Sequence, residues 1–402
     1  MSPILFDTTV RFRLLPFTHT RPVADIRCGI LTMRERWEFL LNNTTSTLTE
    51  SYLQEQFPLG SSTDPILING AVFGTPALTS AILELKPGQK LMKDDLLIAA
   101  RPELQSLEFA TWEMQENLSP VEFTDQVDAL KEVWDIFNLN DLAIRLDFSL
   151  LSKGRTSATI PDYVQVPGRE NLFIEEGAII CPGVIINATT GPVYIGKEAE
   201  ILEGAVIRGP LALCEHAVVK MGAKVYGATT LGPGCKVGGE LSNVVFFANS
   251  NKGHDGYLGN AVIGEWCNLG ADTNCSNLKN NYDYIKIWSE QERKLVATGL
   301  QFCGLLMGDH SKCGINTMFN TGTVVGVSAN IYGAGFPDKF LPSFSWGGAE
   351  GMTTYKLEKA IETADRMMAR RGKQLSGAER KIFAHIFGKT EKQRVLFKAS
   401  IN

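Results

Sequence analysis

The sequence predicts two structural parts: a mixed α/β domain, then an all-β parallel β-helix built from six-residue repeats, with helices after it. Three observations support this fold class. Aliphatic residues recur at every sixth position through the middle of the chain. Short apolar runs alternate with helical patterns before that stretch, and helical spacing returns near the C-terminus.

The six-residue cadence is the strongest signal. It runs without a gap through Ile195, Ile201, Ile207, Leu213, Val219, Val225, Leu231 and Val237. Mostly small residues follow four positions later, at Ala199, Ala205, Leu211, Ala217, Ala223, Thr229 and Cys235. An α-helix of period 3.6 cannot keep such residues on one face, whereas three flat sides of six residues make one turn of a triangular coil. The cadence is expected to resume at Tyr257, Ile263, Leu269, Cys275, Met307, Cys313, Phe319, Val325 and Ile331.

Residues 1–150 have the alternation of a mixed α/β domain. Strands are expected at Pro3–Phe6, Pro65–Asn69 and Asp95–Ala99. Helices are expected at Leu31–Leu40 and Thr124–Phe137.

Residues 151–170 are polar, contain Gly and Pro, and are interpreted as a linker to a β-helix over residues 171–348. The C-terminal segment, 349–402, is expected to hold two basic helices at Tyr355–Arg371 and Gly377–Phe387. These helices either cap the open end of the coil or contribute to a ligand site.

Composition and charge argue against several classes of protein. A net charge of −5 and a pI near 5.7 give no indication of a nucleic-acid or membrane surface. The eight cysteines form no CxxC pair, and Cys235, Cys267, Cys275 and Cys313 fall at inward repeat positions. Reduced thiols and a cytoplasmic protein are therefore expected. The first residues lack the pattern of a signal peptide, and no apolar stretch is long enough for a membrane span.

Two interruptions break the cadence, at Gly238–Gly256 and Ser276–Gly299. Insertions in a solenoid form surface loops that often bind ligands. The first contains His254 between glycines, beside Lys252 and shortly before Tyr257. Imidazole can accept a proton near neutral pH, and nearby asparagines and lysines suit a phosphorylated, hydroxyl-rich substrate. The alternative is that Asn and Gly only fill the tight turns of the coil.

Three segments carry a resemblance to a known family: GHDGYLGN at 253–260, NLGADT at 268–273 and CSN at 275–277. In sequence and spacing they are similar to the acetyltransferase half of the bacterial bifunctional enzyme that makes UDP-N-acetylglucosamine. That enzyme joins glucosamine-1-phosphate N-acetyltransferase to N-acetylglucosamine-1-phosphate uridylyltransferase. The chain looks most like a Bacteroidetes-type variant with a shortened, atypical N-terminal half.

The resemblance implies a left-handed coil and a homotrimer with active sites between subunits. His254 would be the general base on the amino group of glucosamine 1-phosphate. Tyr257 and Asn268 would hold the sugar phosphate, and Asn277 would assist acetyl-CoA. Thr321 is assigned to the same acetyl-CoA site, and the cationic substrate ligands are drawn from Lys252, Lys279, Lys220 and Lys224. Leu278 departs from the tyrosine that the family usually has there, and the second interruption is longer than usual and carries Trp288.

The N-terminal half resembles the sugar-phosphate nucleotidyltransferases less closely. RLLPFTHTRP at 13–22 is similar to a family segment, but the preceding DTTVRFR lacks the glycines that let backbone amides cradle phosphates. Arg13, Arg21 and Asn69 are the nucleotide-binding candidates, together with Arg11 and Arg27. Asp7 and Asp25 are candidate ligands for Mg²⁺, although Asn69-Gly70 replaces the usual Gly-Asp pair, and the metal ligands stay unassigned. The domain is either a rewired uridylyltransferase or a degenerate one.

The resulting hypothesis is acetyl transfer from acetyl-CoA to glucosamine 1-phosphate, coupled to uridylyl transfer from UTP. The acyltransferase part needs no covalent intermediate, so none of the cysteines need act as a nucleophile. Two alternatives stay open. One is a nucleotidyltransferase in which the β-helix only assembles the oligomer; the other is a non-catalytic scaffold that binds sugar nucleotides.

Overall fold

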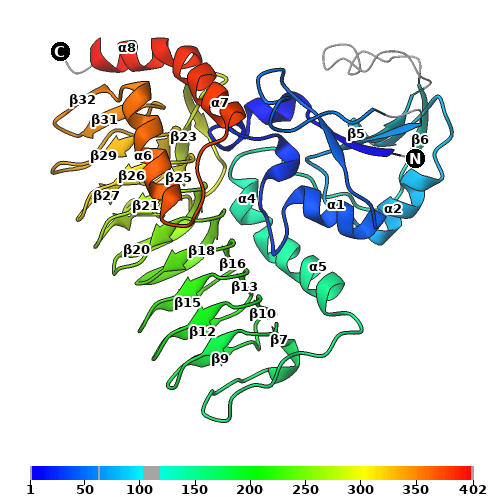
Figure 1. Cartoon of the computed structure of the whole chain (residues 1–402), viewed down its shortest axis with the longest axis horizontal. Coiled ribbons are helices and arrows are strands. Elements are labelled where there is room, and N and C mark those ends of the chain that lie inside the picture. The colour runs from blue at the N-terminus through cyan, green and yellow to red at the C-terminus, as the bar shows by residue number, and fades with distance from the viewer. Residues whose placement is uncertain (1, 62–63, 103–117, 400–402) are drawn as a thin grey trace. The chain divides into compact units, whose positions relative to one another are not determined.

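The computed structural model describes residues 2–61, 64–102 and 118–399. The chain divides into two compact units (Figure 1). The first takes in residues up to 14, 18–26 and 31–133. The second takes in residues 15–17, 27–30 and everything from 134 onward. Among the described residues, every helix is too short or too polar to cross a lipid bilayer.

The first unit contains a six-stranded mixed sheet in the order β2-β1-β3-β5-β4-β6. Its strands are β1 (Ser2–Phe6), β2 (Ser46–Leu48), β3 (Pro65–Asn69), β4 (Gln89–Lys93), β5 (Leu96–Arg101) and β6 (Ser119–Glu122). Its helices are η1 (Thr9–Phe12), η3 (Val23–Asp25), α1 (Met33–Leu41) and α2 (Pro76–Leu83); η2 (Phe17–His19) begins in the second unit and ends in the first. Helix α1 begins at a capping box, because Thr32 and Glu35 satisfy each other's backbone amides. The three predicted strands and the helix near Leu31–Leu40 are confirmed.

The predicted helix at Thr124–Phe137 is wrong over most of its length, because helix begins only at Asp135. Residues 128–130 are extended and pair with residues 71–73. The Phe73 amide donates to the Asp128 carbonyl, and the Leu130 amide donates to the Ala71 carbonyl. Apolar spacing there reflects burial of Ala129 and Leu130 beside the sheet rather than a helical face.

The second unit opens with α4 (Asp135–Asn138), α5 (Asn140–Ser152) and η4 (Arg169–Asn171) and continues as a parallel β-helix. The first long sheet contains β7 (Leu172–Ile174), β9 (Ile185–Asn187), β10 (Val193–Ile195), β12 (Val206–Arg208), β13 (Leu211–Leu213), β15 (Lys224–Tyr226), β16 (Thr229–Leu231), β18 (Glu240–Phe246), β20 (Tyr257–Ile263), β22 (Asn274–Cys275), β25 (Leu306–Met307), β27 (Met318–Phe319), β28 (Val324–Val325) and β30 (Phe340–Leu341). It covers two sides of the coil, because β18 and β20 are long enough to pair with strands on both.

The third side is a ten-stranded sheet. It contains β8 (Ile179–Ile180), β11 (Glu200–Ile201), β14 (Val218–Val219), β17 (Lys236–Val237), β19 (Asn251–Lys252), β21 (Asn268–Leu269), β26 (Lys312–Cys313), β29 (Asn330–Ile331), β31 (Ser345–Gly348) and β32 (Gly351–Thr354). Only the last pair, β31 and β32, is antiparallel.

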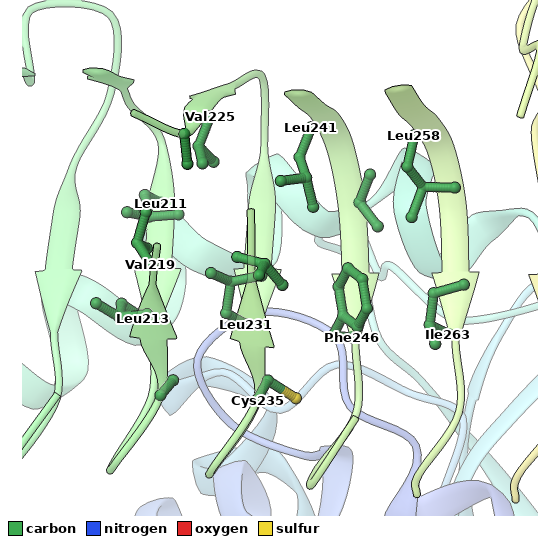
Figure 2. Packing of buried hydrophobic residues seen from close by; sticks show 14 of the residues in the cluster. Leu211, Leu213, Val219, Val225, Leu231, Cys235, Leu241, Phe246, Leu258 and Ile263 are labelled. Carbon is green, nitrogen blue, oxygen red and sulfur yellow. The ribbon is translucent and has the colours of Figure 1, made fainter. Parts of the chain in front are cut away.

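The inward side chains stack in columns along the coil, and Figure 2 shows part of this packing. Val225, Leu241 and Leu258 stand in one column, and Leu231, Phe246 and Ile263 in another. All six are fully or almost fully buried. This continuous apolar stack is the main stabilising feature of the unit. The predicted fold class is confirmed.

The register after Val237 differs from the prediction in one respect. Leu258, not Tyr257, is the inward residue, because it pairs with Leu241 in the ladder, while Tyr257 is only half-buried. The cause is the first interruption, which is a shortening and not an inserted loop. Val237 pairs with Lys252, fifteen residues on, where a regular turn takes eighteen.

The second interruption is a true insertion. It forms an antiparallel hairpin of β23 (Lys286–Ser289) and β24 (Lys294–Ala297). After the coil, three helices follow: α6 (Leu357–Ala369), α7 (Gly377–Lys389) and α8 (Glu391–Ala399). The two predicted C-terminal helices are thus confirmed, and α8 was not predicted.

Candidate active site

A cleft of about 900 Å³ lies between the ten-stranded sheet and α6, with His254 in its wall. The sheet side of the wall is a ladder of outward residues on successive strands: Lys236, Asn251, Asn268 and Lys312. Helix α6 and the residues just after it add Thr363, Arg366, Met367, Arg370 and Arg371. The predicted residues His254, Asn268 and Lys220 therefore share one cleft.

His254 lies in the short turn between β19 and β20, with its side chain exposed. Gly256 forms this turn with a φ of +111°, and a Cβ there would overlap the Thr273 carbonyl oxygen of the next turn. Only glycine fits such a position. Gly253, on the other side of His254, has open space around it. The two flanking glycines therefore differ: Gly256 is required by the coil, and Gly253 leaves room beside the imidazole.

Lys252 lies inside the coil and not on the cleft wall. Its side chain is 1% exposed and stands in the inward column between Val237 and Leu269, where other turns carry aliphatic residues or a cysteine. The ammonium group donates to the carbonyls of Gly238 (3.3 Å), His254 (2.9 Å) and Asp255 (3.1 Å). Burial lowers its pKa to about 8. The predicted substrate ligand therefore supports the His254 turn from within.

The cleft is strongly cationic. Among the described residues that line it, six are lysine or arginine and none is aspartate or glutamate. Arg371 is fixed by hydrogen bonds to the Asn249 (3.0 Å) and Asn251 (3.3 Å) side chains. Lys312 donates to the His310 carbonyl (2.8 Å), and burial lowers the pKa of its ammonium group to about 8.

A second cluster lies on the adjacent side of the coil, where β20 begins. The Asn277 amide donates to Asn260 (2.8 Å) and also hydrogen-bonds the Tyr257 hydroxyl. Burial raises the pKa of Tyr257, so the phenol stays protonated at neutral pH. A Cβ on Gly259 would lie 2.6 Å from the Asn277 amide nitrogen, so the cluster requires glycine there. Tyr257 and Asn277 are thus brought together, but they do not line the His254 cleft.

The remaining predicted β-helix residues lie elsewhere. Lys279, in the second insertion, donates to the Tyr284 carbonyl (2.8 Å) and pairs with Asp283 (3.2 Å). Thr321 is buried, with 5% of its side chain exposed. Lys224 lies beside Glu240 in the ladder of the fourteen-stranded sheet.

The nucleotide-binding candidates of the first unit are largely engaged within the fold. Asn69 uses both ends of its amide, donating to the Leu97 carbonyl (2.9 Å) and accepting from the Ala71 amide (3.0 Å). Arg21 is 6% exposed, and Arg13, which is half-exposed, pairs with Glu132. These contacts are typical of structural residues.

The two carboxylates suggested for Mg²⁺ do not fit a metal site. Asp7 is buried and accepts hydrogen bonds from the Val23 amide (2.8 Å) and the Thr49 hydroxyl (2.6 Å). Burial raises its pKa, which disfavours the charged form that binds a cation. The Asp25 carboxylate accepts hydrogen bonds from Nε (2.9 Å) and Nη2 (2.7 Å) of Arg34. No group of three or more metal-binding side chains occurs in the described parts of the chain.

The cysteines at repeat positions are structural. Cys235, Cys267 and Cys275 are buried in the coil. Burial raises the pKa of the Cys235 thiol to about 12, and it raises those of Cys267 and Cys275 further. A thiolate is the reactive form of cysteine, so these thiols are unreactive at neutral pH.

Sequence reasoning left the role of α6 open between a cap and a ligand site, and it missed Lys236 and Lys312. The helical pattern at residues 355–371 and its arginines were visible, but nothing in the sequence indicated which side of the coil the helix covers. The repeat register could have identified the two lysines. Lys236 precedes the inward Val237 and Lys312 precedes the inward Cys313, so both residues point outward on the same side.

Comparison with known proteins gives two kinds of match. Residues 3–156 match the family described as "Sugar nucleotidyl transferase". "Uncharacterized acetyltransferase YaiX" of Escherichia coli is 25% identical over 194 residues, which covers 48% of this chain and 80% of that protein.

Bifunctional proteins match over shorter shares of their length. "Bifunctional protein GlmU" of Kineococcus radiotolerans is 28% identical over 223 residues, covering 50% of this chain and 41% of that protein. "Bifunctional sugar-1-phosphate nucleotidylyltransferase/acetyltransferase" of Sulfurisphaera tokodaii is 28% identical over 144 residues, 35% of each chain. The chain thus spans less than half the length of these two relatives. The matches support, at modest identity, the resemblance to bifunctional sugar-phosphate enzymes, and they support a transferase.

Proposed function

We propose that this protein transfers an acetyl group from acetyl-CoA to the amino group of a sugar phosphate, with glucosamine 1-phosphate as the expected acceptor. The observation that carries the proposal is the position of His254: an exposed imidazole in a large cleft lined by amides and cations. The acetyltransferase relatives support acyl transfer, and the sugar nucleotidyl transferase match supports a sugar-related substrate.

In the proposed mechanism, the neutral amine attacks the thioester carbonyl of acetyl-CoA. His254 accepts the proton that the amine loses and returns it to the departing sulfur of coenzyme A, so that amide and free thiol are the products. Asn251 and Asn268 line the same wall, and in this mechanism their amides orient the hydroxyl-rich sugar. No protein nucleophile is required, in agreement with the burial of seven of the eight cysteines.

Tyr257 and Asn277 are proposed to act on the adjacent side of the coil, across the turn that carries His254. A site that uses both sides suits a homotrimer in which subunits meet at that edge. Among the described residues, exposed apolar side chains Met221 (69%) and Ile315 (71%) occur on turns of this same coil, which is consistent with such an interface.

Uridylyl transfer by the first unit is the second candidate, supported by the family match of residues 3–156. The internal bonds of Asp7, Asp25 and Asn69 favour a degenerate domain instead. Acetyl transfer is therefore the first candidate.

The test is an incubation of the purified protein with acetyl-CoA, glucosamine 1-phosphate, UTP and Mg²⁺, followed by mass spectrometry. Formation of N-acetylglucosamine 1-phosphate is the expected result. A protein that consumes no acetyl-CoA with this or any other amino sugar phosphate would contradict the proposal and leave the nucleotidyltransferase and scaffold alternatives.

A further inference from the structure

We propose that the cleft between α6 and the ten-stranded sheet binds the phosphate groups of a phosphorylated substrate, and that arginines in the last turn of α6 and just after it form part of that site. The proposal rests on the proposed function, because His254 lines the same cleft. It extends the predicted set of His254, Asn268 and Lys220 on this surface to cations that the sequence analysis did not assign. The cations concerned are Lys220, Lys236, Lys312, Arg366, Arg370 and Arg371.

The first argument is the absence of compensating charge. Of the six cations, only Arg366 forms an ion pair with a described carboxylate, that of Glu362. Elsewhere on α6 the ordinary pairing of a surface helix occurs, since Lys359 also contacts Glu362 (3.0 Å) and does not line the cleft. The chain as a whole has more acidic than basic residues, with a net charge of −5. A cleft whose described lining contains cations and no carboxylate therefore differs from the average surface of this protein.

The second argument is burial. Arg371 and Lys312 are partly removed from water, and desolvation lowers the pKa of each. Removing a cation from water without an anion costs free energy, and a bound anion offsets that cost. Arg371 is also held in place by Asn249 and Asn251, so its guanidinium is oriented before a ligand arrives.

The third argument concerns the kind of anion. Arginine presents parallel N–H donors that match the oxygens of phosphate, and three arginines lie within six residues at the end of α6. A cleft of about 900 Å³ admits a whole sugar phosphate or the nucleotide part of coenzyme A. The acceptor's phosphate and the phosphates of the acyl donor share this chemistry, and the experiment below separates them.

The test uses the double variant K236Q/R370Q, which removes one exposed cation from each wall of the cleft. Lys359→Gln is the matched control, because it removes an exposed cation of α6 outside the cleft. Calorimetry measures the affinity of each protein for coenzyme A, pantetheine, glucosamine 1-phosphate and glucosamine. Unfolding curves verify that both variants fold.

We expect K236Q/R370Q to bind at least one phosphorylated ligand about tenfold or more weakly, with no change for its phosphate-free counterpart. A loss confined to coenzyme A assigns the site to the donor, and a loss confined to glucosamine 1-phosphate assigns it to the acceptor. Unchanged affinity for both phosphorylated ligands, or an equal loss in Lys359→Gln, would overturn the proposal. The binding measurement does not require turnover, so it tests the phosphate site separately from the proposed function. If binding depends on these cations but no acetyl transfer occurs, the phosphate site is supported and the proposed function is not. If the wild-type protein transfers acetyl groups but K236Q/R370Q binds both phosphorylated ligands normally, the phosphate site is contradicted and the proposed function is not.

Discussion

At the scale of single residues, the most informative feature is Lys252, which occupies an inward position of the coil where other turns carry aliphatic residues or a cysteine. Lys252 fills one position of the inward column and is bonded to three carbonyls, among them that of His254. A buried ammonium group is costly unless its hydrogen bonds are satisfied. The hydrogen bonds of Lys252 fix the backbone of the turn that carries His254. This turn holds the imidazole at the edge of the cleft.

Replacing Lys252 by methionine should keep the volume of the core but release the three carbonyls. We expect kcat for acetyl transfer to fall about tenfold or more while the KM for acetyl-CoA changes little, because the turn that carries the proposed base loses the hydrogen bonds that fix it. Ile331→Met, further along the same column and outside the cleft lining, is the control and should retain wild-type kinetics. Equal kinetics for wild type and Lys252→Met would show that the turn does not depend on this contact.

The same lysine should affect stability in a pH-dependent way. Its pKa is lowered to about 8 in the folded protein, so the unfolded chain binds more protons between about pH 8 and pH 10.5. The contribution of Lys252 to the free energy of unfolding should therefore rise across this window. The difference between wild type and Lys252→Met in urea titrations is expected to grow by about 1–3 kcal/mol in favour of wild type. A pH-independent difference would contradict this assignment.

At the scale of elements, the short turn between β19 and β20 decides where the site lies. Gly256→Ala forces a side chain onto a backbone with a φ of +111° and against the Thr273 carbonyl. The free energy of unfolding should fall by about 2–3 kcal/mol. Gly253→Ala, three residues earlier in open space, should cost about 1 kcal/mol or less. Denaturant unfolding measures both losses. Equal losses would contradict the claim that the backbone conformation and close contact of Gly256 require glycine.

The elements also show what the sequence could and could not predict. Repeats from Ile195 to Val237 determine the coil, because each aliphatic residue must find the same side one turn later. The cadence failed to place Tyr257 and Lys252, because three missing residues in one turn shift the register without a visible insertion. His254 was identified from its motif, but the arginines of the cleft depend on how α6 folds back onto the coil, which no local pattern encodes.

At the scale of the whole molecule, the two units differ in how their polar groups are used. The cleft of the second unit leaves cations without carboxylate partners among the described residues, apart from Arg366, whereas Asp7, Asp25 and Asn69 of the first unit are bonded internally. Polar groups without partners in the fold can bind a ligand, whereas polar groups that already have partners stabilise the fold.

This contrast predicts the products of the full-length protein. With acetyl-CoA, glucosamine 1-phosphate, UTP and Mg²⁺ present together, we expect acetylated sugar phosphate to accumulate without UDP-sugar. The physical reason is that the carboxylates and the amide expected to hold metal and nucleotide already have partners in the fold. Mass spectrometric detection of a UDP-sugar would show that the first unit rearranges to bind nucleotide, and it would restore the coupled reaction.

The most direct measurement compares acetyl-CoA turnover in two variants of exposed histidines. His254→Asn removes the proposed base, and His216→Asn removes an imidazole that is 57% exposed on another turn and absent from the cleft. We predict that His254→Asn lowers kcat by about 10²–10⁴-fold without changing the unfolding curve, while His216→Asn retains wild-type turnover. Wild-type turnover in His254→Asn would contradict the assignment of this cleft as the acetyl-transfer site.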